Sequence, residues 1–152
     1  MPRVNRSRLI AVPIERVWEV VSDPHHLPRW WPRAVRVEDV REEEGEAVQW
    51  TTVLGTAAGA RVRADYRRTG GETGRSLAWS QEVAGTPFER ILKSAAVRIE
   101  LEAEGEGSRV TLGVNEVLRG ISRLGSPLMR GAAKRRLDEA LENLDQALAG
   151  VP

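Results

Sequence analysis

Three polar side chains occupy positions on otherwise apolar faces of predicted strands. Gln81 alternates with apolar residues along its strand, as Glu116 does along another, and Tyr66 lies on the apolar face of a third. A carboxylate facing an apolar cavity has a raised pKa and can act as a general acid or base. Tyr66 can donate a hydrogen bond to a ligand carbonyl or enolate. The alternatives are that Glu116 reaches water at its strand end and that the Tyr66 hydroxyl is structural.

Metal chemistry has little support in the composition. The chain has no cysteine, which excludes disulfides, Cys-ligated zinc, iron–sulfur clusters and a cysteine nucleophile. Its only histidines, His25 and His26, are adjacent. A zinc site needs three or four protein ligands at suitable spacing, and no third ligand is evident. We therefore predict no metal site, and no residue pattern requires a cofactor.

Hydrophobic periodicity predicts the elements that position these residues. A strand over 4–12 precedes an amphipathic helix over 14–21, which ends at Ser22-Asp23-Pro24. Prolines allow at most one or two further helical turns over 24–32. The period then changes to two, and six strands joined by short turns follow. Their cores are 35–38, 48–54, 62–67, 77–83, 97–102 and 110–116, with a charged hairpin turn over 41–46.

A long C-terminal helix of about 23 residues is predicted to begin at Ser126-Pro127 and to stop at Gly150. Its apolar stripe consists of Leu128, Ala132, Leu137, Leu141, Leu144 and Leu148. The resulting order is β-α-α-β6-α, which predicts an α+β fold in which one face of a curved antiparallel sheet of about seven strands is covered by this helix. The chain of 152 residues fits a single domain, 1–152.

Charge and hydropathy limit the classes of partner that the chain is expected to bind. The 23 basic and 22 acidic residues leave a net charge of +1, which gives no general attraction to nucleic acids or acidic membranes. Four arginines between Arg61 and Arg68 are expected on an outer face without interleaved aromatic residues, so no nucleic-acid binding is predicted. No apolar run of about 20 residues and no secretory signal is visible, so we expect a cytoplasmic protein without integral membrane association. Only Lys93 and Lys134 are lysines among the basic residues, an arginine bias that suggests a bacterial source.

Three segments carry a resemblance to a known superfamily. Residues 11–23, AVPIERVWEVVSD, and 27–32, LPRWWP, resemble its opening strand, proline, Val-Trp pair and helix-ending Asp. Residues 107–111, GSRVT, resemble its entry to the last strand. On these residues the chain is similar to the SRPBCC superfamily. This superfamily has the helix-grip fold of START domains, birch-pollen-allergen-like proteins and polyketide cyclase/dehydrase-like proteins. The similarity spans roughly residues 3 to 149.

The resemblance implies an internal cavity between the sheet and the C-terminal helix. Its expected partner is a small hydrophobic or aromatic molecule that is lipid-, sterol- or polyketide-like. The alternative for each lining residue is that it fills a closed core. The expected ligand-binding residues are Trp30, Trp50, Val62, Tyr66, Trp79, Gln81, Val97, Ile99, Leu112, Met129 and Ala133.

Three functions remain open on this resemblance. The first is a binding protein for such a molecule. The second is an enzyme like polyketide cyclases, aromatases or dehydrases, with Tyr66, Glu116 and Gln81 as its candidate catalytic residues. The third is a co-chaperone-like interaction domain, which predicts a shallow or filled cavity and an exposed apolar patch. A homodimer is possible.

Overall fold

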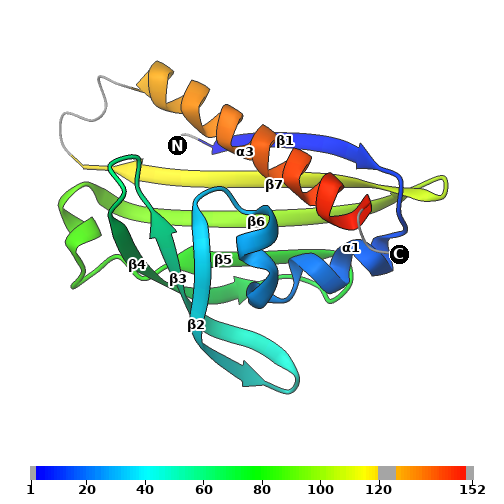
Figure 1. Ribbon diagram of the computed structural model, residues 1–152, viewed down its shortest axis with the longest axis horizontal. Coiled ribbons are helices and arrows are strands. Elements are labelled where there is room, and N and C mark those ends of the chain that lie inside the picture. Colours follow the sequence, from blue (N-terminus) through cyan, green and yellow to red (C-terminus); the bar gives the residue numbers. More distant parts are fainter. Residues whose placement is uncertain (1–2, 120–125, 150–152) are drawn as a thin grey trace.

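Seven strands form one antiparallel sheet in the computed structural model, which describes residues 3–119 and 126–149 (Figure 1). The strand order is β1-β7-β6-β5-β4-β3-β2, so each of the six later strands pairs with its chain neighbour and β1 pairs with β7. The sheet curves around the C-terminal helix, which confirms the predicted α+β helix-grip architecture. The strands are β1 (Arg3–Ile10), β2 (Ala34–Glu43), β3 (Glu46–Gly55), β4 (Arg61–Gly70), β5 (Ser76–Gln81), β6 (Leu92–Glu104) and β7 (Gly107–Leu118).

Three short helices follow β1. The helix α1 (Ile14–Val21) buries three valines, and the turn η1 (Pro24–His26) leads directly into α2 (Leu27–Trp30). The carboxylate of Asp23 accepts a hydrogen bond from the backbone N–H of His25 at 3.0 Å and so caps η1. Prolines occupy first-turn positions of both η1 and α2, where the missing N–H costs no helical hydrogen bond. The predicted helix, its end and the short proline-rich turns are confirmed. A second short turn, η2 (Pro87–Arg90), precedes β6.

The β2–β3 hairpin is tighter than predicted. Its strands extend to Glu43 and from Glu46, and only Glu44 and Gly45 form the turn, both with positive φ (52° and 80°). Positive φ at both central positions suits the right-handed twist of a two-residue hairpin. A register shift near the start of β2 also breaks the predicted alternation, in which Val35 and Val37 share the inner face. Val35 is exposed, whereas Val37 is partly buried.

The long helix α3 (Ser126–Ala149) lies along β1 and β7 and contacts α2 (Figure 1). The predicted stripe is confirmed from Leu137 onward but is wrong at its start, because Leu128 and Ala132 are exposed. The buried stripe instead begins at Ala133, the residue after Ala132. No helix in the described ranges is long and apolar enough to cross a membrane. The buried residues of α3 are Ala133, Leu137, Ala140, Leu141, Leu144 and Leu148.

Two ion pairs hold α3 to the edge strand. Arg6 and Arg8 lie on the same face of β1 as the buried Val4 and Ile10. Their Nε atoms lie 2.8 Å from carboxylates of Asp138 and Asp145, respectively. Both pairs are partly exposed, so they orient the helix more than they stabilise it.

Arg68 departs from the expected outer basic face. It lies opposite Trp79 in the β4–β5 ladder, its side chain is only 13% exposed, and it forms an ion pair with Glu46 at 2.9 Å. The cation therefore packs across the inner side of the sheet instead of facing solvent with its neighbours.

Candidate functional site

The three polar candidates lie in one row across the inner face of the sheet. Trp50 of β3 pairs with Tyr66 of β4, and Tyr66 pairs with Gln81 of β5. Ser80 pairs with Ala96, so the antiparallel register places Gln81 beside Ala95 of β6, and Ala95 pairs with Glu116 of β7. Directly opposite residues share a face. The row thus runs from Trp50 through Tyr66, Gln81 and Ala95 to Glu116, and its Glu116 end lies next to α3.

Among the described residues, Tyr66 has an aromatic neighbour, but its side chain forms no hydrogen bond. Its ring stacks on Trp50, with centroids 6.2 Å apart and planes at 20°. Within the described residues its hydroxyl makes no hydrogen bond. Desolvation raises the pKa of Tyr66 to about 12, with the nearby Arg136 cation opposing this shift and Glu116 adding to it. The phenol therefore stays protonated near neutral pH and acts as a donor rather than as a base.

Glu116 is held by α3. The Arg136 guanidinium donates a hydrogen bond from one terminal nitrogen to Glu116 Oε1 at 2.9 Å, and both side chains are about one-third exposed. The sequence interpretation in which Glu116 simply reaches water at its strand end is therefore incomplete, since a cation covers it. Arg136 was missed from the sequence because the predicted apolar stripe placed it on the outer side of the helix.

Several buried nitrogen and oxygen atoms of this region have no partner within the described part of the chain. The Arg136 Nε, Gln81 Nε2 and Trp50 Nε1 atoms are hydrogen-bond donors without an acceptor. Thr52, two residues along from Trp50, has a similarly unpartnered hydroxyl. An unsatisfied buried polar group costs about 1–3 kcal/mol, so such groups in a native fold require an explanation. Together with Tyr66 they give the interior a surplus of donors.

Tryptophans form the apolar wall beside the polar row. Trp79 lies 5.7 Å from Trp50 and 6.2 Å from Trp31, and Trp31 lies 5.5 Å from Trp30, all in edge-on arrangements. Trp30 comes from α2 and Trp31 follows it, whereas the other two come from strands. The aromatic cluster thus connects the short N-terminal helices to the sheet.

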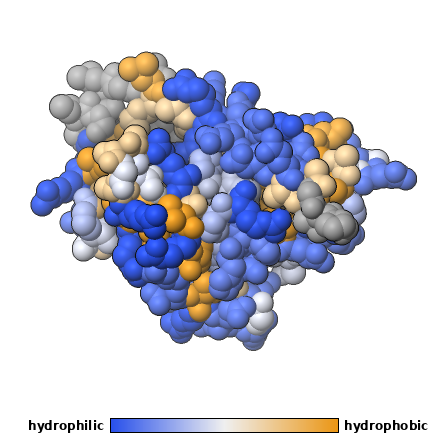
Figure 2. Space-filling model, viewed as in Figure 1, coloured by the Kyte–Doolittle hydropathy of each residue, from blue (hydrophilic) through white to orange (hydrophobic). Residues whose placement is uncertain are grey.

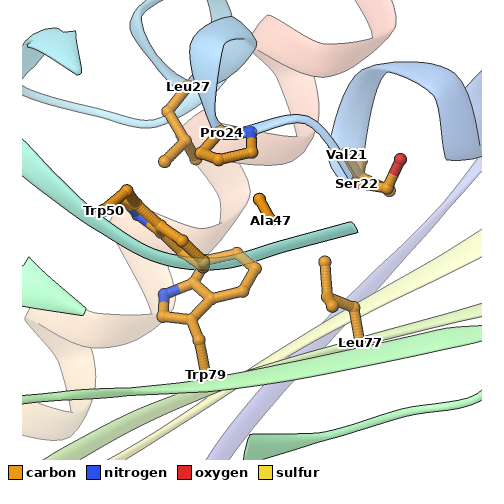
Figure 3. A pocket seen from close by; sticks show the side chains of 8 residues that line it. All are labelled: Val21, Ser22, Pro24, Leu27, Ala47, Trp50, Leu77 and Trp79. Carbon is orange, nitrogen blue, oxygen red and sulfur yellow. The ribbon is translucent and has the colours of Figure 1, made fainter. Parts of the chain in front are cut away.

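A pocket opens on the other side of this wall, between η1 and the sheet (Figure 3). It encloses about 10 Å³, roughly the room for one water molecule, and the rest of the hollow is open to solvent. Leu27 and Pro24 cover it from above, and Trp50, Trp79 and Leu77 line it from the strands. The sequence identified both tryptophans. Leu77 lies on the same predicted strand face as Trp79, which was a usable signal for a third lining residue. The other lining residues are brought to the pocket by tertiary packing, including the fold-back of the short helices: Val21, Ser22, Pro24, Leu27 and Ala47.

The remaining predicted lining residues fall into three groups. Ile99, Leu112 and Ala133 are buried in the core, and Val62 and Val97 are partly buried on the inner face. Trp30 is almost fully buried. Met129 is 39% exposed at the start of α3, so it is not enclosed by the sheet and helix. Ligand contact by any of these residues stays a prediction.

The histidines lie outside this interior. The exposed His25 contacts the carboxylate of Asp23 at 2.8 Å, and His26 lies 3.3 Å from Arg29. Within the described residues, no group of three His, Cys, Asp or Glu side chains has a geometry that could hold a metal ion.

A curved antiparallel sheet gripping a C-terminal helix, with a polar row and an aromatic wall between them, defines a helix-grip protein. Residues 1–149 match the family described as polyketide cyclase / dehydrase and lipid transport, and the chain belongs to this family. Comparison with the curated proteins gives no match.

Solved structures show the same fold. A START superfamily protein from Mycobacterium smegmatis has a TM-score of 0.80 at 13% identity, with 97% of each chain covered. The Zhui aromatase/cyclase from Streptomyces sp. R1128 has a TM-score of 0.76 at 18% identity, covering 97% of this chain and 93% of that one. Ara h 8.0201 has a TM-score of 0.73 at 14% identity, with 98% of each chain covered. At these identities the likeness establishes the fold alone.

Proposed function

We propose that this protein binds a small, largely apolar molecule bearing oxygen acceptors between α3 and the inner face of the sheet. The single observation that carries the proposal is the set of buried donors without acceptors in one region: Arg136 Nε, Gln81 Nε2 and Trp50 Nε1. A ligand carbonyl, enol or carboxylate oxygen would satisfy these donors, and an unmodified hydrocarbon would not.

The surroundings suit a planar apolar body. Trp50 and Trp79 offer ring faces and edges, and the small side chain of Ala95 separates Gln81 from Glu116 in the polar row. Ligand pockets combine an apolar lining with a few placed polar groups, which is the pattern here. The family, which includes polyketide cyclases and lipid-transport proteins, supports the same ligand class.

A catalytic variant of this function is supported by Tyr66. Because its pKa is raised to about 12, the phenol is neutral at physiological pH and would stabilise a developing enolate oxygen by hydrogen bonding. Arg136, held by Glu116, would add positive charge near the same oxygen. An aldol-type cyclisation or a dehydration would use these groups, which is the polyketide cyclase-like alternative.

The test fills the space beneath α3 and compares two matched ligands. Ala95→Leu extends into the polar row, whereas Ala96→Leu adds the same volume on the opposite face of β6 and serves as the control. The ligands are 1-acetonaphthone, which has a carbonyl acceptor, and 1-ethylnaphthalene, which lacks one. Binding is followed by quenching of tryptophan fluorescence. Native mass spectrometry of the purified protein would then show whether it retains a molecule from its host.

We expect 1-acetonaphthone to bind at least about fivefold more tightly than 1-ethylnaphthalene, the value of roughly one hydrogen bond. Ala95→Leu should weaken binding about tenfold or more, and Ala96→Leu should leave it unchanged. Gln81→Leu provides a second variant in case Ala95→Leu perturbs folding, and it should remove the preference for the carbonyl compound. Equal binding of both ligands, or full binding by Ala95→Leu, would overturn the proposal.

A further inference from the structure

Charge is segregated along α3. Its N-terminal half carries Arg130, Lys134, Arg135 and Arg136 and no acidic residue, whereas its C-terminal half carries Asp138, Glu139, Glu142 and Asp145 and no basic residue. The near-zero net charge of the whole chain, +1, conceals this separation. A near-neutral protein can therefore present a local basic surface.

The basic half is not explained by contacts within the protein. Helix dipoles favour acidic residues near the N-terminus and basic residues near the C-terminus, and α3 has the reverse arrangement. Arg130 and Lys134 are four residues apart, a spacing at which like charges repel. Among the described residues, no carboxylate forms an ion pair with Arg130, Lys134 or Arg135, while the acidic half uses Asp138 and Asp145 to bind β1.

Apolar side chains accompany these cations. Leu128 is 81% exposed and Met129 is 39% exposed, both immediately before Arg130. The turn η2 and the start of β6 lie at the same end of the molecule (Figure 1) and add Ile91, which is 58% exposed between Arg90 and Lys93. Figure 2 shows apolar surface at this end, flanked by hydrophilic surface. We call Leu128, Met129, Arg130, Lys134 and Arg135 the basic-apolar surface.

We propose that the basic-apolar surface docks on an anionic lipid membrane. Leu128 and Met129 would enter the boundary between headgroups and acyl chains, and the three cations would contact lipid phosphates. The surface lies at a projecting end of the molecule (Figure 1), which suits a deformable lipid layer better than a protein that must match its shape. Nucleic-acid backbones would use the cations but leave the two exposed aliphatic side chains without a role. This inference is independent of the proposed ligand site.

The first experiment measures co-sedimentation of the full chain with vesicles. Vesicles of phosphatidylcholine containing about 30% phosphatidylglycerol should bind the protein, and pure phosphatidylcholine vesicles should not. Lys134→Gln with Arg135→Gln should reduce binding about tenfold or more, since each cation near an anionic bilayer contributes roughly fivefold. The control, Arg61→Gln with Arg75→Gln, removes equal charge from exposed arginines without ion pairs among the described residues and should leave binding nearly unchanged.

The second experiment separates apolar insertion from simple charge attraction. Leu128→Ser with Met129→Ser should weaken vesicle binding severalfold without changing net charge. Leu9→Ser with Val35→Ser is the control, because these side chains are 52% and 39% exposed elsewhere on the surface. Thermal unfolding of each variant shows that it remains folded.

Failure to bind the anionic vesicles, or equal losses in test and control pairs, would overturn the proposal. Binding to polyglutamate without binding to vesicles would also overturn it and would indicate an acidic polypeptide as the partner.

Discussion

Tyr66 and Gln81 lie directly opposite each other on β4 and β5, yet the Tyr66 hydroxyl and the Gln81 amide nitrogen make no hydrogen bond within the described residues. Both sit on the inner face, where Tyr66 also stacks on the indole of Trp50 and lies near the charge of Arg136. A core selected for stability alone would pair such groups or replace them by apolar ones. The Tyr66 hydroxyl and the Gln81 amide therefore remain available to donate hydrogen bonds to a ligand.

Ionisation of Tyr66 can be followed without interference, because it is the only tyrosine in the chain. The absorbance of tyrosinate should rise with a midpoint near 12 in the folded protein and near 10 in denaturant. Glu116→Gln should lower the folded-state midpoint, since removing a nearby negative charge makes ionisation easier. A folded-state midpoint near 10 would show that the hydroxyl is well solvated and would contradict the burial.

The same shift makes stability depend on pH in a defined window. The folded-state pKa of Tyr66 lies above its unfolded value, so its contribution to stability is fully present below about pH 10 and is lost as the pH rises toward 12. A shift of about two units corresponds to about 2–3 kcal/mol at most. Urea unfolding at several pH values would measure it. Tyr66→Phe is the control, because it cannot ionise and should lose this part of the pH dependence.

Two leucines of α3 that share one predicted stripe should differ in their contribution to folding. Leu137 is fully buried, so Leu137→Ala should lower the free energy of unfolding by about 2–5 kcal/mol. Leu128 is 81% exposed, so Leu128→Ala should change it by about 0.5 kcal/mol or less. Urea titrations of the two variants provide the comparison. Similar losses in both would mean that Leu128 is buried in solution.

The start of α3 illustrates where the sequence pattern stops being sufficient. The sequence predicted the helix, the seven strands and their succession along the chain, because alternation at periods of two and of three to four residues reports directly on burial. It did not predict that β1 pairs with β7. It failed at Leu128 and Ala132 because an apolar residue continues a periodic pattern whether or not the sheet reaches beneath it. Burial there depends on where β1 and β7 lie, which is a tertiary property.

The candidate site was predictable only on its strand side. Alternation placed Tyr66, Gln81 and Glu116 on the inner face, and the register then brings them into one row. Arg136 could not be found in this way, because its charge assigns it to solvent in any pattern analysis. A long arginine side chain can nevertheless reach around the edge of a helix to a carboxylate.

The cap of η1 should control the short helices that cover the pocket. Asp23→Ala removes the acceptor of the His25 backbone N–H and should destabilise the protein by about 1 kcal/mol. Asp23→Asn retains a capping oxygen and should restore most of the loss. For a chain of this length the difference corresponds to roughly 2–5 °C in melting temperature. Equal melting temperatures for all three proteins would show that η1 does not depend on this cap.

The Glu116–Arg136 pair should be coupled, and a double-mutant cycle measures how strongly. Arg136→Met keeps an unbranched stem but removes the guanidinium, which leaves Glu116 partly buried beside the sheet without its cation. Because both side chains are about one-third exposed, the coupling energy should lie near 1 kcal/mol, the upper end of the range for exposed pairs. Glu116→Gln combined with Arg136→Met should therefore be less destabilising than the sum of the single variants. Strict additivity would indicate that water, rather than Arg136, is the main partner of the carboxylate, and the donor-rich interior would then rest on Gln81, Trp50 and Tyr66 alone.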